Sequence, residues 1–217
     1  MTYILLFIAA ALSYFLRKLT LTGAITGWVV ASLIYTGAGY EGISLLAAFF
    51  ILASLATKGK GSKRTSGQVL ANGGVAAILG LCACIWPQNQ TLFQLMMAGS
   101  LASATADTLS SELGTVYGKR FINIITLKND ERGLDGVISI EGTLIGLTGA
   151  AIIAIIYCLF NSWGIQLFYI MAAGFIGNII DSVLGATLER KNFIDNNVVN
   201  FLNTAVGALI CLLLFSL

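Results

Sequence analysis

The chain has 217 residues, of which 57% are hydrophobic and only 10% are charged, with a formal net charge of +2. Soluble domains carry about a quarter charged residues, so this composition excludes an ordinary soluble globular protein. A membrane-spanning helix needs roughly 20 predominantly apolar residues, so about eight spans would use most of the chain and leave only short loops. The composition therefore predicts an all-α, polytopic membrane protein.

Apolar runs separated by polar breaks mark the predicted membrane spans. In chain order we expect about eight transmembrane helices over residues 1–16, 21–37, 42–57, 69–86, 91–111, 137–160, 164–186 and 198–217. The first run lacks a basic leader and continues, after Arg17 and Lys18, into another apolar run, which favours a short first span over a signal peptide. Because no polar linker divides the chain, we expect a single integral membrane domain over residues 1–217.

The basic residues alternate between the predicted loops. Every Lys and Arg falls after the first, third, fifth or seventh span. By the positive-inside rule this face is cytoplasmic, and an even number of spans then leaves both termini non-cytoplasmic. Glu41 falls in the predicted loop between the second and third spans, on the opposite face. We therefore expect a multi-pass protein of the cytoplasmic membrane of a prokaryote.

Two basic loops are candidates for binding phosphate. Their basic residues include Lys58, Lys60, Lys63 and Arg64 before the fourth span and Lys119 and Arg120 after the fifth. Cationic groups gathered in a loop attract anionic ligands to a surface. The alternative is that such residues only orient the protein in the membrane, which is our interpretation of the basic pairs that follow the first and seventh spans.

Carboxylates and amides lie inside the predicted spans or at their ends. The carboxylates are Asp107, Glu112, Glu141 and Asp181, and the amides include Asn72, Asn178 and Asn203. An ionisable group in a span costs roughly 2.5 to 3.5 kcal/mol, so each calls for a partner or a function. All of these groups fall toward the cytoplasmic leaflet, which indicates a common site there. The alternative is that they only form hydrogen bonds between helices.

The fifth predicted span carries two of these carboxylates. Asp107 shares a helix face with Ser103 and Ser111. Glu112 lies five residues further on, about 140° around an ideal helix. Asp107 and Glu112 would therefore share a ligand only if the helix tightened or unwound between them.

These residue types suit phosphoryl transfer at a membrane surface. Because the chain has no histidine and its four cysteines form no CxxC pair, oxygen ligands remain, and they favour a hard ion over zinc. Mg²⁺ bridges phosphate oxygens in nucleotide-dependent enzymes, while Lys or Arg neutralises the remaining charge. Asn72, Gly73 and Gly74 stand at a predicted helix start, where backbone N–H groups could approach a phosphate. The sequence contains no Walker A motif, so the nucleotide chemistry would be specific to a membrane enzyme.

Five segments resemble an integral membrane family that includes plant phytyl-phosphate kinase: SGQVLANGGVAA, SATADTLSSELG, GLDGVISIEGT, DSVLGATLE and VVNFLNTAVGAL. The resemblance covers most of the chain, and ATADTLSSELG is its most specific part. It implies transfer of the terminal phosphate of a nucleoside triphosphate to an isoprenyl monophosphate, such as a phytyl or polyprenyl phosphate, which gives the diphosphate.

The leading hypothesis is therefore a Mg²⁺-dependent lipid-phosphate kinase with its active site at the cytoplasmic leaflet. The expected catalytic residues are Asp107, Glu112, Asp181 and Glu141, of which Asp107, Glu112 and Asp181 are the expected metal ligands. The expected substrate- and phosphate-binding residues are Asn72, Gly73, Gly74, Ser111, Lys63, Arg64, Lys119, Arg120, Asn178 and Asn203. The residues themselves suit CTP, UTP, ATP and GTP alike, whereas the family resemblance favours CTP as phosphate donor.

Two other functions fit the same residues. One is nucleotidyl transfer to a lipid phosphate, and the other is a cation- or proton-coupled transporter whose intramembrane carboxylates mark the ion path. Transporter sites usually lie near the midplane of the bilayer, so a site near one leaflet favours an enzyme. The expected partners are a lipid monophosphate, a nucleotide and membrane lipids, and no nucleic acid.

Overall fold

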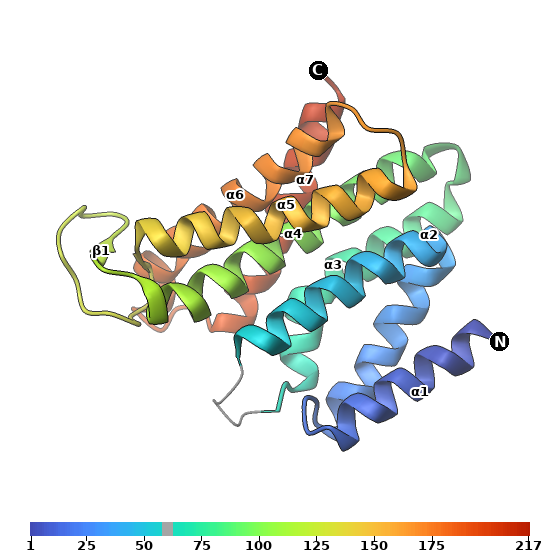
Figure 1. Cartoon of the computed structure of the whole chain (residues 1–217), viewed down its shortest axis with the longest axis horizontal. Coiled ribbons are helices and arrows are strands. Elements are labelled where there is room, and N and C mark those ends of the chain that lie inside the picture. The colour runs from blue at the N-terminus through green and yellow to red at the C-terminus, as the bar shows by residue number, and fades with distance from the viewer. Residues whose placement is uncertain (58–62) are drawn as a thin grey trace.

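The computed structural model describes residues 1–57 and 63–217, and its main elements are helices (Figure 1). In chain order these helices are α1 (Thr2–Phe15), α2 (Leu21–Ala56), α3 (Ser66–Ile85), α4 (Gln90–Tyr117), α5 (Ile140–Phe160), α6 (Gln166–Leu184) and α7 (Asn196–Phe215). Shorter elements are the 3-10 helix η1 (Pro87–Asn89), the π-helix η2 (Gly185–Glu189) and the strands β1 (Ile122–Asn123) and β2 (Val137–Ile138). Lys58 and Lys60, two of the expected phosphate-attracting cations, lie outside the described residues.

The helices have the length and composition of a membrane protein. Within the described part of the chain, 5 helical segments are long and apolar enough to cross a membrane: Leu21–Ala56, Ser66–Ile85, Ile140–Phe160, Gln166–Glu189 and Asn196–Phe215. The apolar helix α1 is shorter, with 14 residues. The prediction of an all-α membrane protein is therefore confirmed, whereas the count of eight spans and the orientation of the termini stay predictions.

Helix α2 is two antiparallel segments joined at a single residue. Gly39 has a φ of 56° and a ψ of −141°, a backbone conformation that glycine adopts readily because it has no Cβ. The Nζ atom of Lys18, before α2 begins, donates a hydrogen bond to the carbonyl oxygen of Ser54 near its end, at 3.4 Å. Both ends of α2 therefore lie side by side, as expected for the separate spans predicted over 21–37 and 42–57.

Glu41 is not in a loop, which corrects the sequence-based placement. The turn at Gly39 uses one left-handed residue, so the helix resumes at once and includes Glu41. The side chain of Glu41 is buried, with 9% of its surface exposed.

The expected helix ends shift by a few residues because of local capping. Thr65 and Gln68 form a reciprocal capping box, so α3 begins at Ser66, ahead of the expected residue 69. Ser139 caps α5 by accepting a hydrogen bond from the Gly142 N–H at 3.1 Å, so this helix begins at Ile140 and not at residue 137.

The segment between α4 and α5 contains the strands, which the sequence-based assignment missed. In the antiparallel pair β1–β2, Ile122 lies opposite Ile138 and Asn123 lies opposite Val137. Two-residue strands carry too few alternating residues to be recognised in a sequence.

Helix α4 is the central element of the bundle, and it contacts α2, α3, α5, α6 and α7. Leu95, Met97 and Leu101 in its first half have no exposed surface. Small residues let its neighbours approach closely: a Cβ atom added to Gly99 would lie 2.6 Å from the carbonyl oxygen of Gly207 in α7. Helix α4 therefore carries its polar side chains between other helices and away from lipid.

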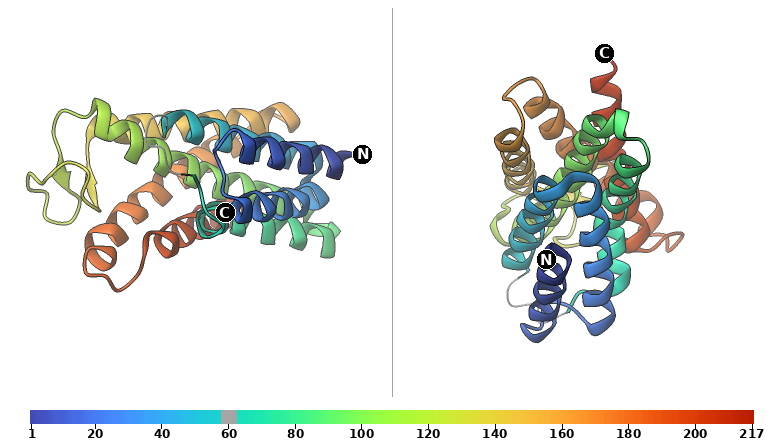
Figure 2. Two further views of the ribbon diagram at one scale, coloured as in Figure 1. Left: turned by 90° about the horizontal axis from the view of Figure 1, so that it is seen from below. Right: turned by 90° about the vertical axis from the view of Figure 1, so that its right-hand side faces the viewer.

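One end of the bundle collects the long connections. The segment between α4 and α5 lies at this end, and the N-terminus lies at the opposite end (Figures 1 and 2). The N-termini of α2 and α3 also come together, because Leu19 forms a parallel β-bridge with Arg64. The loops that the sequence separates by many residues therefore surround a common space.

Candidate functional site

A polar cavity of about 400 Å³ opens at the end of the bundle where these connections meet. Its walls come from α3, α4, α6, η2, α7 and the segment between α4 and α5. Seven residues expected to form the site line it: Arg64, Asn72, Asp107, Ser111, Glu112, Asn178 and Asp181. The tertiary structure thus brings together expected residues from three helices and the segment before α3.

Asp107 on α4 and Asp181 on α6 face one another in this cavity. Their carboxyl groups are close enough for a hydrogen bond between the two side chains. Asp107 has only 9% of its surface exposed. Two acidic groups this close repel each other when both are ionised, so they need a shared proton or a cation between them.

Asn203 holds the second of these carboxyl groups in place. Its Nδ2 atom donates a hydrogen bond to Oδ2 of Asp181 at 3.3 Å. The Ser103 hydroxyl donates to the backbone carbonyl oxygen of Asn203 at 3.1 Å and also contacts its side-chain oxygen. Asn203 is 1% exposed and does not line the cavity. It is therefore placed to hold Asp181 and not to contact a phosphate directly.

Asn72 lines the cavity and contains a buried acceptor without a hydrogen-bond partner in the described part of the chain. Its Nδ2 atom donates to the backbone carbonyl of Gln68 at 3.0 Å, which fixes the orientation of the amide. Its buried Oδ1 atom has no hydrogen-bond partner among the residues that the structure describes. Because a buried acceptor without a partner is costly, this atom is suited to a bound ligand.

The expected set of three carboxylate ligands is not assembled. Within residues 1–57 and 63–217, no three Asp, Glu or Cys side chains form a group that could hold a metal ion. Glu112 lies five residues beyond Asp107 on α4, and its negative charge raises the pKa of the Arg64 guanidinium. Helix α4 continues without a break to Tyr117, so it supplies neither the tightening nor the unwinding that joint ligation required.

Among residues 1–57 and 63–217, Arg64 is the basic residue in the cavity wall. Burial lowers the pKa of its guanidinium, and the nearby Glu112 carboxylate opposes this effect. The ordinary pKa of arginine is so high that the group stays positively charged at neutral pH. It therefore provides a fixed cation beside the acidic residues.

Four other expected residues lie outside the cavity. Lys119 and Arg120 are exposed in the connection after α4. The Oε2 atom of Glu141 accepts a hydrogen bond from the Lys119 backbone N–H at 3.3 Å, so Glu141 ties the start of α5 to this connection. The Lys63 ammonium lies 5.7 Å from the centre of the Tyr14 ring.

The expected role for the backbone of Gly73 and Gly74 is wrong. Because α3 begins at Ser66, both glycines lie in its interior, where their N–H groups form hydrogen bonds within the helix. Both residues are buried, and the Cβ atom that Gly73 lacks would lie 3.0 Å from Val30. These glycines let helices pack closely and leave no free N–H group for a phosphate.

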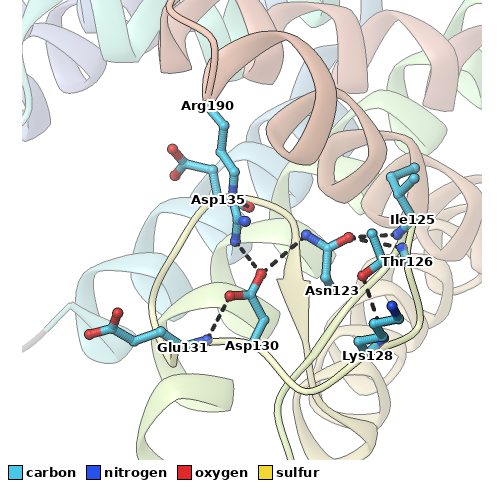
Figure 3. A network of polar contacts seen from close by, with 8 residues as sticks. All are labelled: Asn123, Ile125, Thr126, Lys128, Asp130, Glu131, Asp135 and Arg190. Atoms are coloured by element: carbon cyan, nitrogen blue, oxygen red, sulfur yellow. Dashed lines mark hydrogen bonds and ion pairs between the residues drawn. The ribbon is translucent and has the colours of Figure 1, made fainter.

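An ion-pair network holds the connection between α4 and α5 against η2 (Figure 3). Arg190 lies 2.8 Å from Oδ2 of Asp130 and donates from Nε to the backbone carbonyl of Asp135 at 2.6 Å. Asn123 donates to the same Asp130 oxygen at 3.2 Å. The pKa of Asp130 is lowered, mainly by the hydrogen bond from the Glu131 backbone N–H and also by Arg190 and Asn123. Since residues 133–139 line the cavity, this network positions one of its walls.

Several cavity residues were missed or left out of the expected site. They are Thr57, Gln68, Thr108, Ser110, Thr115, Asp135, Ser139, Ser182, Glu189, Asn196 and Asn200. Glu189 and Asn200 lie within segments that carry the family resemblance and were detectable there. Asp135 and Ser139 also lie within such a segment, GLDGVISIEGT, but in or beside the connection, where no helical periodicity indicates which way a side chain points.

Comparisons with known proteins agree with this membrane architecture. The model of the family described as "Integral membrane protein DUF92" matches residues 4–208. An uncharacterized membrane protein of Methanocaldococcus jannaschii is 36% identical over 210 residues, covering 92% of this chain and 87% of the relative. An uncharacterized membrane protein of Synechocystis is 32% identical over 213 residues, covering 90% of this chain and 82% of the relative.

A plant relative is more distant. The chloroplastic protein VTE6 of Arabidopsis thaliana is 28% identical over 216 residues, covering 90% of this chain and 65% of the relative. No solved structure matches the chain.

Proposed function

The chain belongs to the DUF92 family of integral membrane proteins, and from this premise we propose that it is a lipid-phosphate kinase of the membrane. The reaction transfers the terminal phosphate of a nucleoside triphosphate to an isoprenyl monophosphate and forms the diphosphate. The observation that carries the proposal is the facing pair Asp107 and Asp181 in a polar cavity that also contains Arg64. The chloroplastic plant relative and the resemblance to the family that includes plant phytyl-phosphate kinase support it.

The donor set of the cavity fits Mg²⁺. This ion is usually held by one or two carboxylates together with phosphate oxygens and water, so a cluster of three carboxylates is not needed. Asp107 and Asp181 would hold it, and Asn72, whose Oδ1 atom has no hydrogen-bond partner among the described residues, lines the same cavity. When bound, Mg²⁺ supplies neutralisation of charge on the phosphate oxygens.

The protein residues contribute alignment and charge. The attacking oxygen of a lipid monophosphate is already anionic, so the reaction needs no general base. Two anionic phosphates must instead approach each other, and the fixed positive charge of Arg64 reduces their repulsion.

The decisive experiment uses the purified full chain in lipid nanodiscs with Mg²⁺, isoprenyl monophosphates and CTP, UTP, ATP or GTP in turn. The proposal expects a lipid diphosphate and a nucleoside diphosphate in equal amounts, with CTP as the best donor. Release of inorganic pyrophosphate would instead identify nucleotidyl transfer. Absence of nucleotide-dependent conversion with every chain length and nucleotide would refute both reactions.

A further inference from the structure

A second cavity adjoins the polar one and has the opposite character. It has a volume of about 200 Å³ and lies between α1, the two segments of α2 and α3. Aliphatic and aromatic side chains form most of its walls, including Leu6, Val30, Leu46, Phe49 and Phe50. Such a surface binds hydrocarbon and offers little to a nucleotide or an ion.

The two cavities share one stretch of wall. Arg64, Gln68 and Asn72 line both of them. Residues 68 and 72 are one helical turn apart on α3, and Arg64 lies just before this helix. A ligand with a charged group and an apolar chain could therefore cross this wall with each part in matching surroundings.

We propose that the apolar cavity holds the first part of the hydrocarbon chain of the lipid monophosphate, whose phosphate contacts Arg64 at the shared wall. From there the phosphate points toward Asp107 and Asp181. This inference rests on the proposed function for the identity of the reaction. The inference adds the surface that binds the hydrocarbon chain. It also identifies Arg64 as the residue at the boundary between the phosphate and the hydrocarbon chain of the lipid.

Arg64 is built into the fold at this boundary. Its backbone N–H donates to the carbonyl oxygen of Lys18 at 3.0 Å, and its own carbonyl accepts from the Thr20 N–H at 3.0 Å. Its guanidinium lies 5.8 Å from the centre of the Phe49 ring, a wall residue of the apolar cavity. A guanidinium over an aromatic face keeps its charge while its stem covers apolar surface, so Arg64 suits a phosphate joined to a hydrocarbon chain.

Helix α1 provides the outlet for the rest of the chain. It stays partly or fully exposed along its whole length and packs chiefly on α2. Ala9, an exposed residue of α1, lines the apolar cavity. A hydrocarbon chain longer than the cavity therefore continues past α1 into the bilayer. The protein then binds the first isoprene units, and the remainder stays in lipid.

Filling the cavity tests this inference. Gly27 lines it, and the nearest described atom to a Cβ atom added there is Leu19 Cδ1 at 3.7 Å, an ordinary contact. Gly27→Leu therefore places its side chain in the cavity without displacing backbone. Val29→Phe adds similar bulk to the same helix at a position that is 45% exposed and outside the cavity, and it serves as the matched control.

The measurement is equilibrium binding of radiolabelled isoprenyl monophosphates to the full chain in detergent micelles, without nucleotide. We expect Gly27→Leu to weaken binding of a 20-carbon isoprenyl monophosphate at least tenfold and to weaken binding of a five-carbon one less, because the short chain fills less of the cavity. Val29→Phe should bind both normally. Arg64→Gln should weaken both by a similar factor, because both carry the phosphate.

Unchanged binding of the 20-carbon compound by folded Gly27→Leu would overturn the inference, as would equal weakening of both compounds. If this variant fails to fold, Ala47→Leu applies the same test, because Ala47 is exposed and lines the same cavity. Because the binding measurement contains no nucleotide, it tests the lipid site independently of the kinase reaction. Lipid binding sensitive to Gly27→Leu without phosphate transfer would refute only the kinase, and transfer with insensitive binding would refute only the lipid site.

Discussion

The two walls of the site are built differently. On the side of α4, α6 and α7, Asp107, Asp181 and Asn203 are buried or partly buried and linked by side-chain interactions between closely packed helices. On the side of α1, α2 and α3, the wall is mainly apolar, with Arg64 fixed through its backbone. Rigid placement suits phosphoryl transfer, where small displacements are costly, whereas an apolar wall suits a flexible hydrocarbon chain. Variants of the two walls should therefore have different effects on the reaction.

The largest effect is expected from neutralising the central carboxylate. Asp107→Asn keeps the shape of the side chain but removes the charge that would hold Mg²⁺, so lipid diphosphate formation should fall by about 100-fold or more. The matched control is Glu41→Gln, which removes another buried carboxylate away from the cavity and should retain activity. Equal activity of Asp107→Asn and the parent protein would exclude Asp107 as a metal ligand.

A smaller effect is expected from removing the support of Asp181. Asn203→Ala deletes the hydrogen bond to Asp181. A bond to a charged group contributes about 1.5 to 3 kcal/mol, and because this one is long, at 3.3 Å, the lower value applies and activity should fall roughly tenfold. The Mg²⁺ concentration needed for half-maximal activity should rise as well, which a loss of folded protein alone would not cause. Asn161→Ala, an amide at the end of α5, is the control. An unaltered Mg²⁺ dependence would argue against a positioning role for Asn203.

The smallest effect concerns the wall between α4 and α5. Arg190→Gln removes the ion pair with Asp130, so the KM for nucleotide should rise about threefold and amides of residues 122–138 should exchange hydrogen faster. Lys191→Gln removes an exposed neighbouring charge and should change neither quantity. Faster exchange in both variants would show that general charge, and not this ion pair, holds the wall.

The same network predicts a dependence on pH with a defined sign. The pKa of Asp130 is lower in the folded protein than in the unfolded chain, so its contribution is present above the ordinary aspartate pKa of about 4. It is lost as the pH falls below that value and Asp130 takes up a proton. The protection of amides in residues 122–138, measured relative to their intrinsic exchange rates at each pH, should therefore fall on acidification in the parent protein. Asp130→Asn should lack this fall in protection, and an identical pH profile of protection in both proteins would contradict the assignment.

Much of the fold could be predicted because membrane helices are long apolar runs bounded by polar residues. The predicted spans agree with α1, both segments of α2 and α3 to α7 to within a few residues, except that α4 extends to Tyr117. The extension was hidden because Glu112 and the polar residues around it resemble a helix end, although this part of α4 faces the cavity. Strands β1 and β2 were hidden because they are too short to show a period.

The candidate site could be predicted only as a group of residues at a common depth. Sequence position along a helix determines depth, which is why Asn72, Asp107, Asn178 and Asp181 could be assigned to the same end of the bundle. Their partners depend on how helices rotate and pack against each other. This explains why Glu141 contacts the Lys119 backbone outside the cavity and why Gln68 was overlooked.

The sequence by itself determined the membrane class, the approximate helices and the alternation of basic loops, because each follows from local hydrophobicity and charge. The tertiary structure decided that Asp107 meets Asp181 and not Glu112, because these partners lie on different helices and their contact depends on packing. It also decided that Arg64 separates a polar cavity from an apolar one. The shared wall lies on residues 64–72, but the rest of the apolar cavity comes from α1 and α2 and most of the polar one from α4, α6, α7 and the segment between α4 and α5, so no single segment of the chain contains both cavities.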